Sequence, residues 1–114
     1  MHEVGIMESA MALVQRHADE QRATCVHRVV LKVGALSGVE PDSLRFAFEV
    51  VTRGTRAEQA ELVIDLVPAL IFCSSCQAEF PGDRGAIFTC PHCGDLCGEI
   101  RSGRELELSR IEMS

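Results

Sequence analysis

The chain has 114 residues, of which 46% are hydrophobic, and a formal net charge of −6 at pH 7. This length predicts one domain, or one small domain with an added module. Aromatic residues make up only 4%, without Trp or Tyr, which disfavours surfaces that stack nucleic-acid bases. The acidic balance also repels a duplex on average. We therefore expect no nucleic-acid partner.

The compartment is predicted from two absences in the sequence. No apolar stretch reaches the roughly 18 residues of a membrane-spanning helix, so we expect no membrane span. No basic segment followed by an apolar one opens the chain, so we expect no secretory signal and a cytoplasmic protein. In that compartment disulfides are uncommon, and paired cysteines are typical of metal binding.

The first half of the chain has the apolar spacing of helix, strand and helix. A helix is predicted from Glu3 to about Gln21, where apolar residues recur three and four positions apart. These residues are Val4, Met7, Met11, Val14 and Ala18. The alternation in residues 27–34 is that of a strand. A second helix is predicted from Pro41 to about Thr52, since proline suits the first helical position.

Two further strands are predicted from alternating patterns in residues 61–67 and 104–113. The order strand, helix, strand favours a parallel pair whose connection includes the second helix. Residues 69–103 differ in composition and are interpreted as an inserted module. The predicted fold class is α+β, a small mixed three-stranded sheet with two helices plus an inserted zinc-ribbon module. The main domain would comprise residues 1–68 and 104–114.

The inserted module contains two C-x2-C pairs, Cys73 with Cys76 and Cys90 with Cys93. Two such pairs supply four thiolates, which suit a closed tetrahedral Zn²⁺ site with a structural role. A module of about 35 residues buries too little apolar surface to fold alone, so metal binding would supply the missing free energy. The alternatives are an iron site of the rubredoxin type and a dithiol redox pair.

Two cysteines remain outside these pairs. Cys25 is interpreted as a small buried hydrophobic residue. Cys97 lies four residues after Cys93, so it is either a competitor for the metal or a bystander.

The chain begins MHE, which places an imidazole beside the terminal amine. In one interpretation His2 is an exposed terminal residue without a role. In the other, the α-amine of Met1, backbone nitrogen and the His2 imidazole chelate one cation. Such a nitrogen set favours the square-planar ions Ni(II) and Cu(II).

Several segments together resemble the HypA/HybF family of hydrogenase-maturation nickel metallochaperones. They are MHE at the start, VGALSGVEPDSLRFAFEVVTRGT in the middle, the two C-x2-C pairs, and GRELEL near the end. The resemblance covers nearly the whole chain in order. It implies a nickel-binding domain over residues 1–68 and 104–114, with Ni(II) at His2, and a structural zinc domain on Cys73, Cys76, Cys90 and Cys93.

The resemblance also implies partners and a destination. They are the GTPase HypB and the large-subunit precursor of [NiFe]-hydrogenase, with urease served by some relatives. A second copy of the chain is a further candidate partner. The chain lacks the G-x-x-x-x-G-K-[ST] motif of a P-loop, so a nucleotide-driven step would come from another protein.

Several roles and functions stay open at the level of sequence. Glu40 is either an acid at a helix start or a carboxylate near the nickel, and His92 is interpreted as a solvent-facing residue of the second C-x2-C pair. The competing functions are a zinc-ribbon adaptor, which predicts a basic face that the chain lacks, and a small metalloenzyme, which needs an open metal site. We therefore expect a delivery protein and not an enzyme.

Overall fold

A computed structural model describes residues 2–82 and 88–114. The chain forms two compact units, each described by itself below. The first comprises the residues up to Leu31, Val39–Asp65 and Glu107–Ser114; the second comprises Lys32–Gly38 and Leu66–Leu106. The predicted division into a nickel-binding domain and a zinc-ribbon domain stays a prediction. No helix in the described part of the chain is long and apolar enough to cross a membrane.

The helices and strands follow the predicted order closely. The helices are α1 (Glu3–Glu20) and α2 (Pro41–Val51). The longer strands are β1 (Val26–Gly34), β2 (Glu61–Val67) and β8 (Leu106–Met113). Between β2 and β8 lie β3 (Leu70–Cys73), β4 (Ala78–Pro81), β5 (Phe88–Thr89), β6 (Leu96–Cys97) and β7 (Glu99–Ser102).

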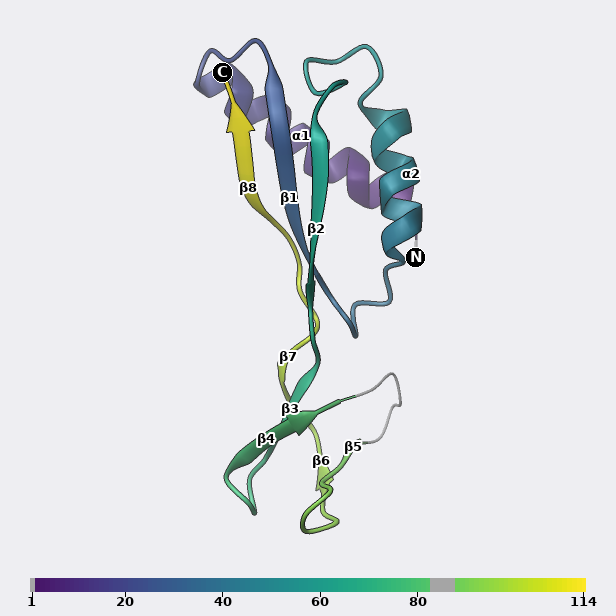
Figure 1. The fold of residues 1–114 in the computed structure, drawn as a ribbon, viewed down its shortest axis with the longest axis vertical. Coiled ribbons are helices and arrows are strands. Elements are labelled where there is room, and N and C mark those ends of the chain that lie inside the picture. The colour runs from purple at the N-terminus through teal and green to yellow at the C-terminus, as the bar shows by residue number, and fades with distance from the viewer. Residues whose placement is uncertain (1, 83–87) are drawn as a thin grey trace. The chain divides into compact units, whose positions relative to one another are not determined.

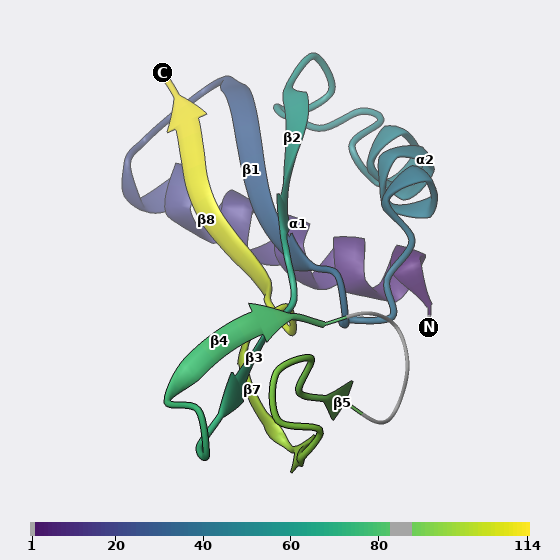
Figure 2. The same ribbon diagram turned by 60° about the horizontal axis from the view of Figure 1, so that its bottom comes forward.

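The first unit is built on a three-stranded sheet in the order β2-β1-β8. Strands β1 and β2 run in the same direction and β8 runs in the opposite one, while α1 crosses behind the strands (Figures 1 and 2). The predicted α+β class with a mixed sheet is therefore confirmed. The helices α1 and α2 contact each other and contribute the stripes that face the core.

Helix α1 buries one stripe and ends in a defined motif. The buried positions are Met7, Met11, Val14 and Ala18, spaced four, three and four residues apart. Val4, the first residue of the predicted stripe, is 45% exposed because the stripe runs past the core at the helix start. At the other end Arg22 adopts φ 55°, and the N–H of Ala23 donates to the carbonyl of Ala18 at 2.8 Å. This is the Schellman arrangement, which uses carbonyls that the helix leaves unpaired.

The loop after α2 is tied to the end of α1 by one guanidinium. Arg56 donates from Nε to Gln15 Oε1 at 2.7 Å and from a terminal nitrogen to the Ala23 carbonyl at 2.8 Å. It also pairs with Asp19. A guanidinium has several donors in fixed directions, so this single side chain contacts two residues of α1 and one residue of the turn that follows it.

The second unit contains two small antiparallel sheets. Strands β4, β3 and β7 form one in that order, and β5 pairs with β6 in the other. Its buried cluster consists of Ile71, Cys73, Phe80 and Cys90. Two of these four residues are cysteines, so apolar contact and the sulfur atoms share the same small core.

Two glycines meet where β1 leaves the sheet and β8 approaches it. A Cβ placed on Gly34 would lie 2.0 Å from the carbonyl oxygen of Gly103, far inside any allowed contact. Around this point Gly34 N–H donates to the Glu105 carbonyl at 2.7 Å and Leu36 N–H donates to the Gly103 carbonyl at 2.6 Å. The close backbone approach therefore requires a residue without a side chain at position 34.

We predict that Gly34→Ala lowers the free energy of unfolding, by about 1–3 kcal/mol or more, because the backbone must separate to admit the methyl group. Gly98→Ala is the matched control, since a Cβ there meets no atom within 4 Å. Chemical denaturation of both variants measures the difference. Equal stability of the two variants would contradict the close approach at Gly34.

Candidate metal centres

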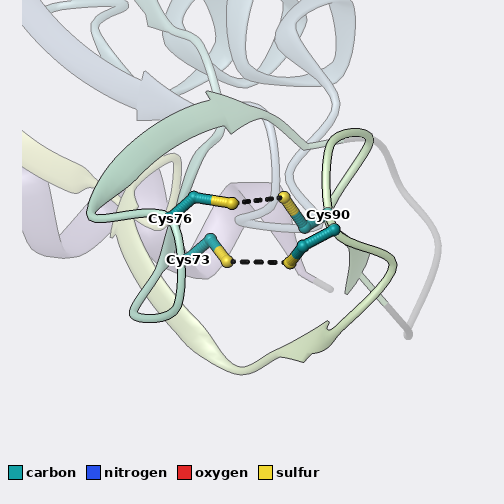
Figure 3. A group of neighbouring side chains, drawn as sticks. Cys73, Cys76 and Cys90 are labelled. Carbon is teal, nitrogen blue, oxygen red and sulfur yellow. Dashed lines mark hydrogen bonds between the residues drawn. The ribbon is translucent and has the colours of Figure 1, made fainter.

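The two C-x2-C pairs lie on turns of the second unit. Cys73 is the last residue of β3, and Cys76 lies in the turn before β4; Cys90 follows β5, and Cys93 lies in the turn before β6. The sulfur of Cys76 points towards that of Cys90, and a second sulfur pair faces across the same space (Figure 3). The structure thus brings together the four cysteines that the sequence singled out.

The distances between sulfurs fit a tetrahedral metal site. Cys73 and Cys93 have their Sγ atoms 3.6 Å apart, and the Sγ atoms of Cys76 and Cys90 are 3.8 Å apart. All four lie within 4.8 Å of one another. A tetrahedron with zinc–sulfur bonds of about 2.3 Å has edges of about 3.8 Å. A disulfide would require about 2.05 Å. The cluster therefore fits a four-sulfur metal site of the zinc-ribbon kind.

The two cysteine turns share a backbone conformation. The residue after each C-x2-C pair has a positive φ, 53° at Gln77 and 78° at Gly94. The N–H of Gly94 donates to the carbonyl of Cys90 at 2.9 Å. Ser75 Oγ donates to Asp95 Oδ2 at 2.5 Å and links the two turns. These contacts hold the four sulfurs facing one another.

Hydrogen bonds within the turns bias which thiols ionise first. The backbone N–H of Cys76 donates to the sulfur of Cys73 and lowers the pKa of that thiol to about 7. Backbone donors on Cys93 and His92 lower the pKa of Cys90. Bonds from the side chains of Cys93 and Cys90, with burial, raise the pKa of Cys76 to about 12. The first thiol of each pair is therefore the readier source of thiolate, the form that binds a metal.

The other two cysteines lie outside the four-sulfur cluster. Cys97 packs against the buried cluster that contains Cys73 and Cys90, and burial raises the pKa of its thiol to about 11, so it remains protonated at neutral pH. Cys25 is half-buried in the first unit, where its Sγ lies 3.8 Å from Nδ1 of His27. His92 is exposed within the second pair, as expected for a solvent-facing residue.

His2 lies at the start of the first unit. It is exposed and occupies the N-cap position of α1, where its carbonyl accepts the first helical hydrogen bond, from Ile6 N–H at 3.2 Å. Its side chain makes no capping bond. The predicted ligand Met1 lies outside the described residues. The described part of the terminus therefore presents an imidazole that no helix-capping bond engages.

A surface hollow of about 450 Å³ opens beside His2 between the starts of α1 and α2. It is lined by His2, Glu3, Val4, Asp42, Ser43 and Phe46. Sequence reasoning missed the three residues from α2. For Phe46 the sequence did hold a signal of an exposed apolar residue, because its position falls outside the face of Leu44, Ala47 and Phe48. In the structure Phe46 is 67% exposed.

Glu3 connects the two helix starts. Its Oε2 accepts a hydrogen bond from the backbone N–H of Glu40 at 3.4 Å. Glu40 is the N-cap residue of α2, and its side chain makes no capping bond. The contact places Glu40 next to the first turn of α1 through its backbone; the role of its carboxylate remains a prediction.

These features define a class: a small α+β protein in which a mixed sheet carries two helices and two cysteine turns form a zinc-ribbon-like site. The family described as "Hydrogenase/urease nickel incorporation, metallochaperone, hypA" matches residues 1–113. The chain therefore belongs to the HypA family of nickel metallochaperones.

Relatives and solved structures agree with this assignment. A protein of Picosynechococcus sp. named "Hydrogenase maturation factor HypA" is 43% identical over 114 residues, 99% of each chain. "Guanidine hydrolase-activating protein A" of Synechocystis sp. is 41% identical, over 98% of this chain and 94% of its own. The solution structure of the Ni metallochaperone HypA from Helicobacter pylori matches with a TM-score of 0.67 and 26% identity, over 99% of this chain and 97% of its own.

We predict that Cys90→Ala abolishes tight zinc binding, because a closed site loses one of its four thiolates. The second unit should lose its order while α1 and α2 persist. Metal analysis and amide hydrogen exchange measure the two effects. Cys97→Ser is the control and should retain one zinc per chain; a full equivalent of tightly bound zinc in Cys90→Ala would disprove the ligand assignment.

Proposed function

We propose that the protein binds Ni(II) at its N-terminus and delivers it, with the GTPase HypB, to the large-subunit precursor of [NiFe]-hydrogenase. The observation that carries the proposal is the exposed His2 at the start of α1, in a member of a nickel-incorporation family. The ligands would be the His2 imidazole, the Met1 amine and backbone nitrogens. In this proposal the protein acts in the cytoplasm and catalyses no reaction of its own.

The charge around His2 supports cation binding. Glu3 and Asp42 line the same hollow as His2, so two acidic residues lie near the proposed site. Their field raises the local concentration of a cation before any ligand binds it. Because His2 is exposed, a receiving protein can reach the metal and replace its ligands one at a time. These features favour transfer over permanent storage.

The four-sulfur site would have a structural role, unlike the nickel site at His2. It fits Zn²⁺ with every position of the tetrahedron taken by protein sulfur, so it leaves no open position for a substrate. We propose that zinc there holds the second unit folded. Nickel at His2 would be the cargo, and zinc a resident part of the structure.

The recipient enzyme is the least constrained part of the proposal. The Picosynechococcus and Synechocystis relatives differ in what their names say: one is a hydrogenase maturation factor and the other a guanidine hydrolase-activating protein. We propose the hydrogenase precursor, and a nickel-dependent hydrolase is the second candidate because of the Synechocystis relative. Nickel transfer from the loaded protein to each purified apo-enzyme distinguishes the two.

We predict that His2→Ala abolishes tight nickel binding without changing zinc content or stability, because an exposed terminal side chain contributes little to the fold. His2→Gln should have the same effect, since an amide is a poor substitute for imidazole on nickel. Extra residues ahead of Met1 should weaken binding by converting the amine to an amide. Calorimetric titration with Ni(II) at neutral pH measures all three.

A matched control for these variants is His17→Ala, which removes an exposed imidazole from the other end of α1. It should bind nickel as the native protein does. Nickel affinity should also fall as the pH is lowered, because amine and imidazole bind a metal only after losing their protons. If His2→Ala binds nickel as tightly as the native chain, the proposed site does not exist.

The partner is expected to meet the face beside the nickel site, where Phe46 is exposed next to His2. We predict that Phe46→Ser weakens association with the GTPase and leaves nickel affinity unchanged, because the apolar contact is lost while the ligands remain. Leu96→Ser is the control, since Leu96 is 76% exposed in the second unit. Surface-binding kinetics of the two variants test this; association of Phe46→Ser as tight as that of the native chain would place the interface elsewhere.

A further inference from the structure

The three-stranded sheet of the first unit has an open edge at β8. This strand is the outer one in the order β2-β1-β8, and among the described residues no further strand pairs with it (Figure 1). A hollow of about 610 Å³ lies beside it, lined by Leu108–Met113 of β8 and by His17 and Gln21 at the end of α1. Consecutive residues of a strand point to opposite faces, so a hollow that all of Leu108–Met113 line follows the edge of the strand. The β8 edge is therefore open to solvent.

The backbone at the end of β8 shows which residues direct their polar groups outward. Ser114 N–H donates to the carbonyl of Cys25 at 2.9 Å, and its carbonyl accepts from Cys25 N–H at 3.1 Å, so the backbone of Ser114 faces β1. The polar groups of successive residues in a strand point to opposite sides. Those of Met113 and Ile111 therefore point away from β1, at the open edge. Such an edge is a template on which another strand can pair.

A row of alternating charges crosses the sheet and ends at this edge. Glu61 of β2 pairs with Arg28 of β1 at 3.1 Å, and Arg28 also pairs with Glu112 of β8 at 3.3 Å. Glu112 in turn pairs with Arg110, two residues away on the same strand, at 3.3 Å. The side chain of Arg110 is 69% exposed. The open edge thus presents one basic and one acidic side chain on the same face of the sheet, with Ile111 between them in sequence.

We propose that two copies of the chain associate through β8, with the two strands antiparallel and Ile111 of each copy at the twofold axis. In this register Arg110 lies opposite Glu112 of the second copy, and Glu112 lies opposite Arg110 of the second copy. Ser109 lies opposite Met113. The two three-stranded sheets then form one continuous sheet, and the row of alternating charges continues across the axis. This inference concerns self-association and does not depend on nickel or zinc.

The charges on β8 select this register over its neighbours. A shift of the pairing by two residues places Arg110 opposite Arg110, or Glu112 opposite Glu112, and like charges directly opposite each other are destabilising. A shift by one residue opposes side chains from different faces of the two strands. In the proposed register the backbone groups of Arg110 and Glu112 face their own β1, so these residues form the pairs without mutual hydrogen bonds, whose side chains approach most closely.

The other outer strand, β2, does not have this self-complementarity. Its two charged residues, Glu61 and Asp65, are both acidic, so no register of β2 with a second β2 sets opposite charges against each other. The charges therefore favour β8 as the self-associating edge. Exposed ion pairs each add little affinity, so their contribution is to choose the register, while backbone hydrogen bonds and the contact between the Ile111 side chains hold the strands together. We expect a dimer that dissociates on dilution.

The test is sedimentation velocity of the full chain over a series of protein concentrations. Salt at about 0.15 M screens the long-range repulsion between two chains that each carry a net charge of −6. The variants are Arg110→Glu and Glu112→Arg, measured separately and as an equal mixture. Arg45→Glu is the matched control, because it makes the same change of charge as Arg110→Glu at an exposed position of α2. Circular dichroism of each variant checks its fold.

We expect the native chain and Arg45→Glu to dimerise alike as concentration rises. Arg110→Glu and Glu112→Arg alone should each dimerise about tenfold more weakly or worse, because like charges then meet at both symmetric positions. The equal mixture should recover dimers, because the two acidic residues of one variant then face the two basic residues of the other. A native chain that stays monomeric throughout would overturn the inference, as would a mixture that associates no better than its separate components.

Amide hydrogen exchange of the native chain gives a second measurement that needs no variant. The N–H groups of Ile111 and Met113 lie at the open edge and would be hydrogen-bonded in the dimer, so their exchange should slow as the protein concentration rises. The N–H of Ser114 already pairs with Cys25 within one chain and serves as the internal reference. Exchange at Ile111 and Met113 that is independent of concentration would place any dimer contact elsewhere and overturn the proposal.

Discussion

The second unit depends on the meeting of four sulfur atoms. Its buried cluster contains Ile71 and Phe80 as large apolar residues, and the other two members are cysteines. So few apolar side chains cannot offset the entropy of ordering the chain. Zinc on four thiolates contributes about 10–16 kcal/mol in comparable small modules. With zinc bound as we propose, the metal site would hold the two-residue strands β5 and β6 in place.

Most of the first unit was predictable because its elements are periodic and one-sided. The stripe from Met7 to Ala18 is buried as its spacing indicated, and Pro41 begins α2 where its missing N–H does no harm. The order of strand, helix and strand favoured a parallel pair, and β1 and β2 form one within the mixed sheet. The cysteine spacing likewise predicted the cluster, since a two-residue gap turns both thiolates of a pair towards one point.

What could not be predicted depends on contacts between segments distant in sequence. Strands β3 to β7 are only two to four residues long, too short for an alternating pattern to predict them. The hollow beside His2 arises only when α1 and α2 pack together, and Phe46 and Asp42 reach it from the second helix. The neighbourhood of Cys73 and Cys97 is similar, since it follows from the contact of β3 with β6 and not from the four-residue step after Cys93.

The hydrogen bond from Glu40 N–H to Glu3 has a consequence for how firmly a cation would be held. A free peptide that chelates a metal through backbone nitrogens must first give up many conformations, and that loss weakens binding. Here the chain from Glu3 onward is already ordered, at one side by α1 and at the other by the start of α2. Much of the conformational entropy is thus lost during folding, before any metal arrives. A chelate at the N-terminus, as we propose, would therefore bind tightly while remaining open to ligand exchange, a combination that a flexible tail would not provide.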